Sequence, residues 1–354
     1  MTSAILQLIP SAITIVFSFY GCFHFISEVF TSFIPFGTLL VGTIVFAIYA
    51  LRVPPPPKEA VEAIIGKDLL DNEDQEGYVL KTVAHRGAGL DAPENSLAAF
   101  DLCHASGCDF IEFDVTLTSD GIPVVFHDST LERMADSNVV VSQTAYEVLK
   151  DIDISVKHPL RDRFGVTNIP TLDQTVIKLL RNGQKMIIDI KDNSTKMVPV
   201  ILDLFVRYPN LYSNAFVTSF FPNIIYLVRR TDPKIVCSLG YRPHMFASQS
   251  FKYPVGQGPN RATQFWKTQF FAFCDILHTW AISRITYYVL GIPVILLQKD
   301  CISPEIILKW RSKGVRVMAW TVNSPTEKQH ISRNLKITYL TDTLTGELSA
   351  HSSC

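Results

Sequence analysis

Eight short apolar segments alternate with helix-like segments between Thr82 and Leu340, and this order constrains the fold more than any other feature. The segments are almost continuously apolar, as strands buried on both faces are. Eight β/α units over about 270 residues favour a TIM-type (β/α)8 barrel, an α/β fold, over an open sheet. The expected strands are 82–85, 110–117, 185–190, 216–219, 235–239, 294–297, 315–321 and 337–340.

Helical patterns fit between most of these strands. Several begin with Pro or Ser directly after a strand, which suits the first turn of a helix. Pro123–Phe126 is an extra strand, which should pair back as a hairpin because a turn at Ser119–Gly121 precedes it. The expected helices are 96–105, 172–180, 198–208, 222–230, 304–313 and 325–333.

The N-terminal segment is nearly free of charge. Glu28 is the only charged residue between Met1 and Leu51, and Thr31–Leu51 has 21 residues without a charge. About 20 apolar residues span a bilayer, so residues 1–52 are expected to form a transmembrane anchor of one or two helices. We favour a hairpin of two spans that turns near residues 28–35.

Residues 53–76 are expected to form a linker, and residues 77–348 the barrel domain. Pro54–Pro57 cannot continue a helix and favours an extended spacer, and an acidic stretch, 68–76, follows it.

The chain gives conflicting signals about which side of the membrane the barrel occupies. Arg52, Lys58 and Lys67 favour the cytoplasm, whereas the sequon at Asn193 would be glycosylated only in the lumen. We therefore predict a membrane protein of the endoplasmic reticulum, another endomembrane or the plasma membrane, without assigning a side.

Composition argues against nucleic-acid binding and against a site or framework built on cysteines. A formal net charge of -1 gives no field that would attract nucleic acid. The seven cysteines are scattered and lack CxxC spacing, so neither a zinc site nor a disulfide framework is expected.

Polar side chains cluster at the carboxyl ends of the expected strands, where TIM barrels carry their chemistry. Residues two apart in a strand share a face, so Glu112 and Asp114 should both point into the barrel mouth, as should Asp189 and Lys191. Any one carboxylate could instead cap a helix or pair with an arginine. Three aimed into one cavity would repel one another without a cation, and oxygen ligands suit Mg2+ or Ca2+.

Two histidines and two cations complete a constellation suited to phosphodiester cleavage. His85 and His127 each end a strand, and imidazoles can take a proton from an attacking oxygen and return one to a leaving alcohol. Arg86 offers a planar fork for phosphate oxygens, and Lys191 offers a point charge. His24, His158, His244, His278 and His330 are interpreted as structural.

Seven motifs follow one another along the chain: His85-Arg86-Gly87, Pro93-Glu94-Asn95-Ser96, Glu112-Phe113-Asp114, Ser119–Asp128, Ile169-Pro170-Thr171-Leu172, Asp189-Ile190-Lys191 and Trp320-Thr321-Val322-Asn323. In this order they resemble the glycerophosphodiester phosphodiesterase family from about Lys81 to Asp342. The N-terminal membrane segment, the Gln298–Asp300 run and the long insert before it are more specifically similar to the membrane-bound branch that acts on glycerophosphoinositol.

The resemblance also implies a role for each residue at the site. It makes His85 and His127 the acid/base pair. It also places Arg86 and Lys191 at the phosphate, and Trp320 on the wall of the substrate site. The implied metal ligands are Glu112, Asp114 and Asp189. Many family members have Glu where this chain has Asp189, one methylene shorter, which could leave a water between this ligand and the ion.

The insert, at about residues 243–292, carries an aromatic stripe. Trp266, Phe270, Phe273, Leu277 and Trp280 recur at helical spacing. One interpretation is that this stripe packs against the barrel wall. The other is that it lies in a membrane interface beside the site, where Trp is favoured.

The sequence thus predicts a membrane-anchored, Mg2+-dependent hydrolase that converts a glycerophosphodiester to glycerol 3-phosphate and an alcohol, inositol foremost. A lysophospholipase D acting on lysophospholipids or N-acyl glycerophosphoethanolamines keeps the same site with an acylated substrate. A catalytically inactive membrane scaffold is the alternative from a different class, and the complete set of polar residues argues against it. The predicted partners are the small-molecule substrate and the lipid bilayer, not nucleic acid.

Overall fold

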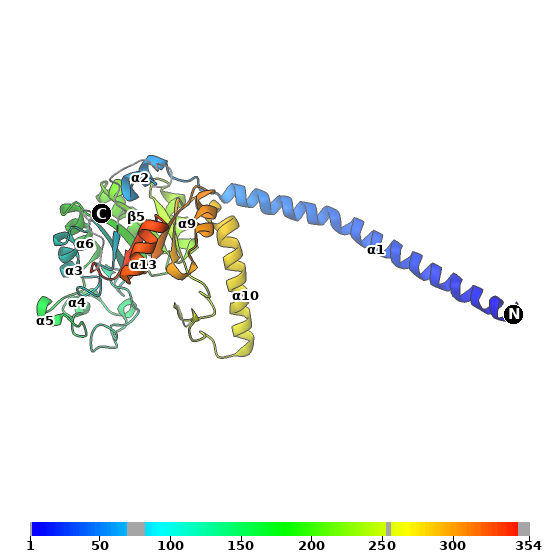
Figure 1. Ribbon diagram of the computed structural model, residues 1–354, viewed down its shortest axis with the longest axis horizontal. Coiled ribbons are helices and arrows are strands. Elements are labelled where there is room, and N and C mark those ends of the chain that lie inside the picture. The colour runs from blue at the N-terminus through cyan, green and yellow to red at the C-terminus, as the bar shows by residue number, and fades with distance from the viewer. Residues whose placement is uncertain (1, 69–81, 253–255, 346–354) are drawn as a thin grey trace. The chain divides into compact units, whose positions relative to one another are not determined.

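The computed structural model describes residues 2–68, 82–252 and 256–345. The chain divides into two units, Met1–Arg52 and Val53–Cys354 (Figure 1). The predicted start of the barrel domain at residue 77, most of the acidic stretch before it and the predicted end at residue 348 lie outside the described residues.

The first unit is one helix, α1 (Thr2–Leu51). It runs through residues 28–35, so the predicted turn of a two-span hairpin is wrong. Residues 28–34 contain no Gly, Pro, Asn or Asp that would end a helix, and Pro35, at the end of the predicted turn, lies within α1 without ending it. By length and composition, Phe17–Leu51 is a helix that could cross a membrane.

The second unit is built on a closed barrel of eight parallel strands, which confirms the predicted fold. Pairing of β1 with β2 closes the ring β1-β2-β4-β5-β6-β9-β10-β11, and β3 (Pro123–Val125) adds to β2 in antiparallel fashion, as the hairpin prediction required. The barrel strands are β1 (Thr82–His85), β2 (Phe110–Leu117), β4 (Lys185–Ile190), β5 (Ala215–Ser219), β6 (Cys237–Tyr241), β9 (Val294–Gln298), β10 (Arg316–Trp320) and β11 (Tyr339–Thr341).

Helices cover the outside of the barrel near their predicted positions, and local chemistry sets where they begin. Ser96 caps α3, Thr171 and Gln174 form a capping box on α6, and proline occupies the first turn of α9, α12 and α13. One face of each strand packs under these helices in the main hydrophobic core. The helices are α3 (Leu97–Ala105), α6 (Leu172–Arg181), α7 (Met197–Arg207), α8 (Leu211–Asn214), α9 (Pro222–Thr231), α12 (Pro304–Arg311) and α13 (Pro325–Gln329).

The opposite face of the strands fills the barrel interior with a second core. Phe110 and Phe216 meet edge to face there, with ring centroids 6.2 Å apart. The amino-terminal end of this interior is closed by α2 (Lys58–Ile65), whose Val61, Ile64 and Ile65 are buried in the same core. The prediction of a plain linker over residues 53–76 is therefore wrong for residues 53–65. The apolar side chains of this stretch cover the barrel interior, which would otherwise be open to water at this end.

The closing role of α2 gives a stability prediction. Ile64 is completely buried, so Ile64→Ala is expected to lower the free energy of unfolding by about 2–5 kcal/mol through lost burial and the cavity left behind. Leu308 on α12 is 62% exposed, and Leu308→Ala should change it by less than about 0.5 kcal/mol. Urea unfolding of both variants in the same detergent measures the difference. Equal values would show that α2 does not seal the barrel.

An extension between β3 and α6 carries its own small core on the hairpin side of the barrel. It contains a 3-10 turn at Val141–Gln143, α4 (Tyr146–Leu149) and α5 (Arg161–Phe164). Phe126, Leu131 and Ile154 belong to its buried cluster. This cluster fixes the segment that holds His127.

The insert between β6 and β9 folds into a hairpin and a long helix. The elements are β7 (Phe251–Lys252), β8 (Gly256–Gln257), α10 (Phe265–Ala281), a π-helical turn at Ile282–Thr286 and α11 (Tyr287–Leu290). The aromatic stripe of α10 is exposed, with Trp266 at 65% and Phe273 at 60%. Packing of the stripe against the barrel wall is therefore wrong, because α10 turns its opposite side, around the buried Asp275, toward the rest of the insert.

Candidate active site

Strand register brings the predicted site residues together at the carboxyl end of the barrel. His85 lies beside Glu112 in the β1–β2 pair, and Asp114 lies beside Asp189 in the β2–β4 pair. A cavity of about 520 Å³ lies at this end of the barrel. Its lining includes His85, Arg86, Glu112, His127, Asp189, Lys191 and Trp320, that is, every predicted site residue except Asp114.

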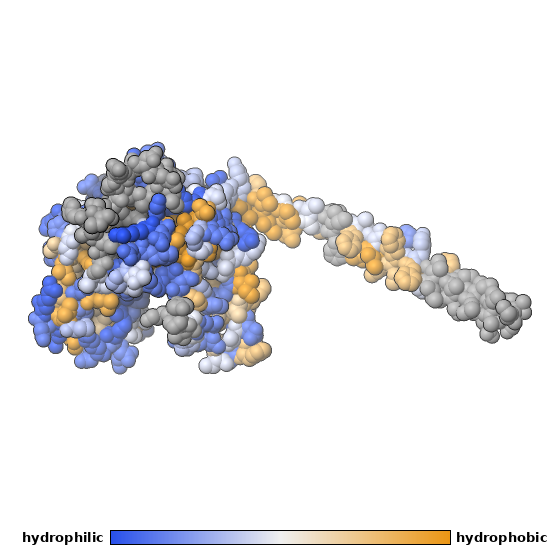
Figure 2. All heavy atoms as spheres, in the orientation of Figure 1, coloured by the Kyte–Doolittle hydropathy of each residue, from blue (hydrophilic) through white to orange (hydrophobic). Residues whose placement is uncertain are grey.

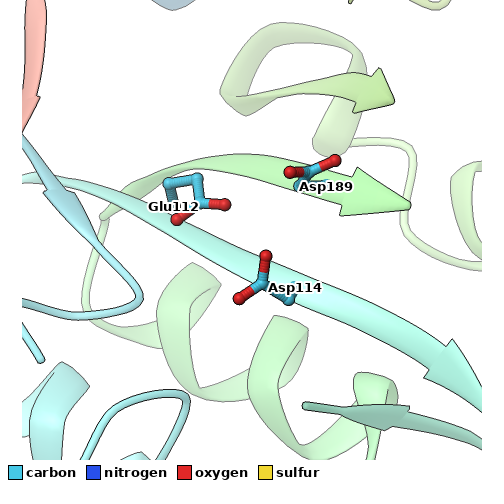
Figure 3. A group of neighbouring side chains, drawn as sticks. All are labelled: Glu112, Asp114 and Asp189. Atoms are coloured by element: carbon cyan, nitrogen blue, oxygen red, sulfur yellow. The ribbon is translucent and has the colours of Figure 1, made fainter. Parts of the chain in front are cut away.

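Three buried carboxylates form the floor of this site. One oxygen from each of Glu112, Asp114 and Asp189 lies within 4.8 Å of the others, and Figure 3 shows the three side chains converging from β2 and β4. Oδ1 of Asp189 is buried without a hydrogen-bond partner among the described residues. An all-oxygen donor set with an unsatisfied buried oxygen fits a hard divalent cation.

The electrostatics of the cluster agree with this fit. Burial raises the pKa of Glu112, and the negative charges of Asp114 and Asp189 raise it further. Burial also acts to raise the pKa of Asp114, but the positive charges of Lys191 and Arg86 outweigh it and hold that pKa below its usual range. Burial raises the pKa of Asp189 as well, and the negative charge of Asp114 adds to this effect. A dication among the three carboxylates would favour their ionised forms.

Arg86 is fixed by a sharp turn after β1. Its backbone is left-handed (φ 54°) and its N–H donates to Oε2 of Glu112 over 2.9 Å. Gly87 follows, also at positive φ, where an added Cβ would come within 2.8 Å of the Phe100 ring. The Arg86 guanidinium lies 3.0 Å from Oε1 of Glu94 and 3.2 Å from Oδ2 of Asp114. The turn therefore places the Arg86 guanidinium beside the carboxylate cluster.

Asn95, which sequence reasoning quoted only as part of a motif, orients Asp114. Its side-chain amide donates to Oδ2 of Asp114 over 2.8 Å and accepts the backbone N–H of Asp114 over 3.1 Å. Asn95 is fully buried. This two-way contact sets the rotamer of a carboxylate that has no freedom to swing out of the cluster.

Lys191 follows β4 and Trp320 ends β10, strands that lie opposite each other in the ring. Nζ of Lys191 is 2.9 Å from Oδ1 of Asp114 and 2.5 Å from Oδ2 of Asp189, so it contacts the acidic cluster directly. Trp320 meets Phe220 edge to face at 5.5 Å, and its indole N–H donates to the carbonyl of Leu296. These contacts hold one aromatic ring in place as a wall of the cavity.

Each histidine of the site is held by a carboxylate. Nδ1 of His85 lies 2.5 Å from Oδ1 of Asp342, and Nδ1 of His127 lies 2.6 Å from Oδ1 of Asp128. Burial opposes ionisation of Asp128, but its hydrogen bond with His127 lowers its pKa to about 2. The second nitrogen of His85 is 3.9 Å from Oε2 of Glu112. A histidine bonded in this way presents Nε2 for proton transfer.

A chain of ion pairs that sequence reasoning missed links the two histidine regions. Arg133 donates to Oδ2 of Asp128 over 2.6 Å and to Oε2 of Glu94 over 3.0 Å, and Glu94 also accepts from Arg86. Asp342 was missed likewise, although its position after the last strand was a signal. Arg133 lies in the irregular extension, where no periodic pattern points to it.

Asp342 gives a prediction about positioning. Asp342→Asn keeps the shape of the side chain but removes the charge that orients His85, so kcat is expected to fall by about tenfold to a hundredfold with KM little changed. The pH–rate profile should also shift, which a merely structural role would not cause. Steady-state kinetics from pH 5 to 9 measure both. Asp101→Asn, at an exposed carboxylate on α3, is the matched control, and an unshifted profile for Asp342→Asn would contradict the role.

Comparison with known proteins identifies what the chain is similar to. Residues 85–342 match the model of the glycerophosphoryl diester phosphodiesterase family. Glycerophosphodiester phosphodiesterase 1 of Mus musculus is 33% identical over 298 residues, covering 84% of this chain and 85% of the mouse protein. The Homo sapiens protein of the same name is 35% identical over 272 residues, covering 77% and 80%.

Solved structures show the same fold at low sequence identity. A phosphodiesterase of Oleispira antarctica, solved in complex with the product sn-glycerol-3-phosphate, has a TM-score of 0.59 at 19% identity over 78% of this chain and 98% of that one. A protein of Silicibacter pomeroyi, described as a putative glycerophosphoryl diester phosphodiesterase, has a TM-score of 0.57 at 20% identity, covering 77% and 93%.

Proposed function

This chain belongs to the glycerophosphoryl diester phosphodiesterase family and is a phosphodiesterase, and we propose that it hydrolyses glycerophosphoinositol to glycerol 3-phosphate and inositol. The observation that carries the proposal is the convergence of three buried carboxylates, two carboxylate-bonded histidines and Arg86 on one cavity. The cavity is large enough for a glycerol, a phosphate and a six-carbon polyol.

The proposed chemistry follows from the side chains. One histidine of the pair His85 and His127 takes a proton from the attacking oxygen, which forms a new bond to phosphorus, and the other donates a proton to the alcohol oxygen as its bond to phosphorus breaks. With water as the net reactant, its hydroxyl ends on phosphorus and its proton on the alcohol. Arg86 offsets negative charge on the phosphoryl oxygens.

We propose Mg2+ as the cation that Glu112, Asp114 and Asp189 hold, with Ca2+ as the alternative of the same ligand preference. When bound there, the ion would polarise the phosphoryl oxygens as a Lewis acid. Lys191 contacts two of these carboxylates, so it would hold the cluster together and share in balancing the substrate's charge.

A product assay tests the substrate. Purified full-length protein incubated with glycerophosphoinositol and Mg2+ should release inositol and glycerol 3-phosphate in equal amounts, which an enzymatic glycerol 3-phosphate assay and anion chromatography both measure. Release of inositol phosphate with free glycerol would mean that the opposite phosphorus–oxygen bond breaks, and would refute the proposed orientation.

A lysophospholipase D activity is the second candidate, because the cavity lining includes apolar side chains. Phe251 and Leu90 belong to it, and Leu90 is 59% exposed. An acyl chain needs apolar contacts of this kind, whereas a free glycerophosphodiester does not. Side-by-side assays with lysophosphatidylcholine and glycerophosphoinositol decide between them, since only the first would yield lysophosphatidic acid.

We propose α1 as a membrane anchor, since Phe17–Leu51 is long and apolar enough to cross a bilayer. The full chain should then stay in the membrane pellet after alkaline carbonate extraction, and release into the supernatant would refute the anchor. Asn193 is exposed in the loop after β4, so glycosylation at this sequon would identify the barrel as lumenal.

A further inference from the structure

The exposed stripe of α10 has no role in the proposed chemistry, although it gathers several large apolar side chains on one face of a helix. The helix is 17 residues long, about 25 Å, and Figure 2 shows hydrophobic residues along it. Side chains of this size are normally buried in a soluble domain, and a continuous exposed row of them marks an interaction surface. The stripe consists of Trp266, Phe270, Phe273, Leu277 and Trp280, and Ile276, which flanks it, is exposed as well.

The exposed charged side chains of α10 and of the turn after it are both basic. Lys267 and Arg284 are exposed at opposite ends, and each lies over a stripe tryptophan, 5.3 Å from the ring of Trp266 and 5.6 Å from that of Trp280. The acid of this segment, Asp275, is buried. The stripe is therefore apolar along its length, with an indole and a cation at each end.

The buried Asp275 also joins α10 to the active-site wall. Its two carboxylate oxygens accept the backbone N–H groups of Phe246 and Ala247, each over 2.9 Å. The same loop continues to Gln249 and Phe251, which line the catalytic cavity. The surface that α10 presents is thus held in fixed relation to one side of the cavity mouth.

We propose that α10 docks on the surface of a lipid bilayer containing anionic lipids, with the stripe in the interfacial region and the barrel above it. Indoles at both ends and basic residues beside them are the composition that favours an interface, where Trp rings lie at headgroup depth and cations meet lipid phosphates. The docked helix places the cavity wall next to the membrane, where lipid-derived phosphodiesters arise.

A second copy of this chain fits the stripe less well than a bilayer does. Two copies that paired along α10 about a twofold axis would run either antiparallel or parallel. The first arrangement brings Lys267 beside Arg284 and the second brings each residue beside its own copy, so like charges would meet in both. A bilayer instead meets both cations with phosphate and serine carboxylate groups.

Tryptophan quenching tests the proposal on the full chain. We would reconstitute the protein into vesicles of phosphatidylserine and phosphatidylcholine whose acyl chains carry bromine, a short-range quencher. Two of the four tryptophans lie on the stripe, while Trp310 is buried and Trp320 lines the cavity. The wild type should be quenched, and the double variant Phe273→Asp/Ile276→Asp should lose at least about half of that quenching because carboxylates do not enter the interface.

Controls make the outcome decisive. Both substituted residues are exposed, so circular dichroism and the thermal midpoint should be unchanged, and Leu308→Asp, an equally exposed position on α12, should leave quenching intact. An unquenched wild type, or quenching that the double variant retains, would overturn the proposal. The readout does not depend on hydrolysis, so it stands or fails separately from the proposed substrate.

Discussion

Glu112→Gln is expected to lower kcat by at least about a hundredfold while the protein stays folded. The amide oxygen can still accept the backbone N–H of Arg86, which Glu112 now accepts over 2.9 Å, so the turn after β1 should keep its shape. The substitution removes one of three carboxylates whose oxygens lie within 4.8 Å of one another. A divalent cation should then bind more weakly, and the charge that develops on the phosphoryl oxygens should lose its main counter-charge.

The measurement combines kinetics with metal removal. Wild-type activity on glycerophosphoinositol should disappear in excess EDTA and return when Mg2+ exceeds the chelator, and Glu112→Gln should need a higher Mg2+ concentration for whatever activity remains. Glu147→Gln, at an exposed carboxylate on α4, is the matched control and should behave as the wild type. Full activity in EDTA would refute the assignment of the three carboxylates as metal ligands.

The barrel was predictable because strands buried on both faces leave a strong signal. All eight predicted strands overlap those in the structure, and β1, β2 and β4 match residue for residue. The ends of β6 and β11 differ by two residues or fewer, since apolar runs do not mark where ladder pairing stops. Helix starts were predictable where a cap such as Ser96 or Thr171 leaves a local signature.

Elements without periodicity were harder to predict. The helix α2 is only 8 residues long and follows four prolines, so a spacer was the natural interpretation, and its burial depends on a barrel end that forms only in the folded chain. The extension at 126–171 was missed for a related reason, since its core draws on short irregular pieces rather than on one amphipathic element.

The site could be predicted as far as strand geometry determines it. Glu112, Asp114 and Asp189 were identified because their strands end at one rim. Partners that meet only in space, such as Asp342 with His85 or Arg133 with Glu94, are 257 and 39 residues apart in sequence, so no local pattern pairs them. Only the position of Asp342 after the last strand was a signal. Helical spacing likewise revealed the α10 stripe but not what it faces, because periodicity reports one apolar side and not its surroundings.

His85→Ala and His127→Ala are each expected to lower kcat by about 10²- to 10⁴-fold, the range that general acid or base catalysis supplies. The two losses should differ in their dependence on the leaving group. An alcohol such as inositol must be protonated as it departs, whereas p-nitrophenolate leaves as a stable anion. Removing the acid therefore matters little for a p-nitrophenyl ester, while removing the base matters for both.

The experiment assigns the two roles by rescue. Glycerophosphoinositol and glycerol 3-(p-nitrophenyl phosphate) should be compared with the wild type and both variants, and one variant should recover most of its activity on the activated ester while the other does not. The recovered variant lacks the acid.

The control is a histidine outside the pair. His158→Ala, which removes an imidazole bonded to the carbonyl of Gly89 beside the site, should show no preference for the activated ester. Asp128 and Asp342 hold the two imidazoles through the same nitrogen, so the rescue experiment assigns the two roles. Loss of equal size on both substrates in both variants would contradict the division of labour and would instead favour two histidines that only bind the phosphate.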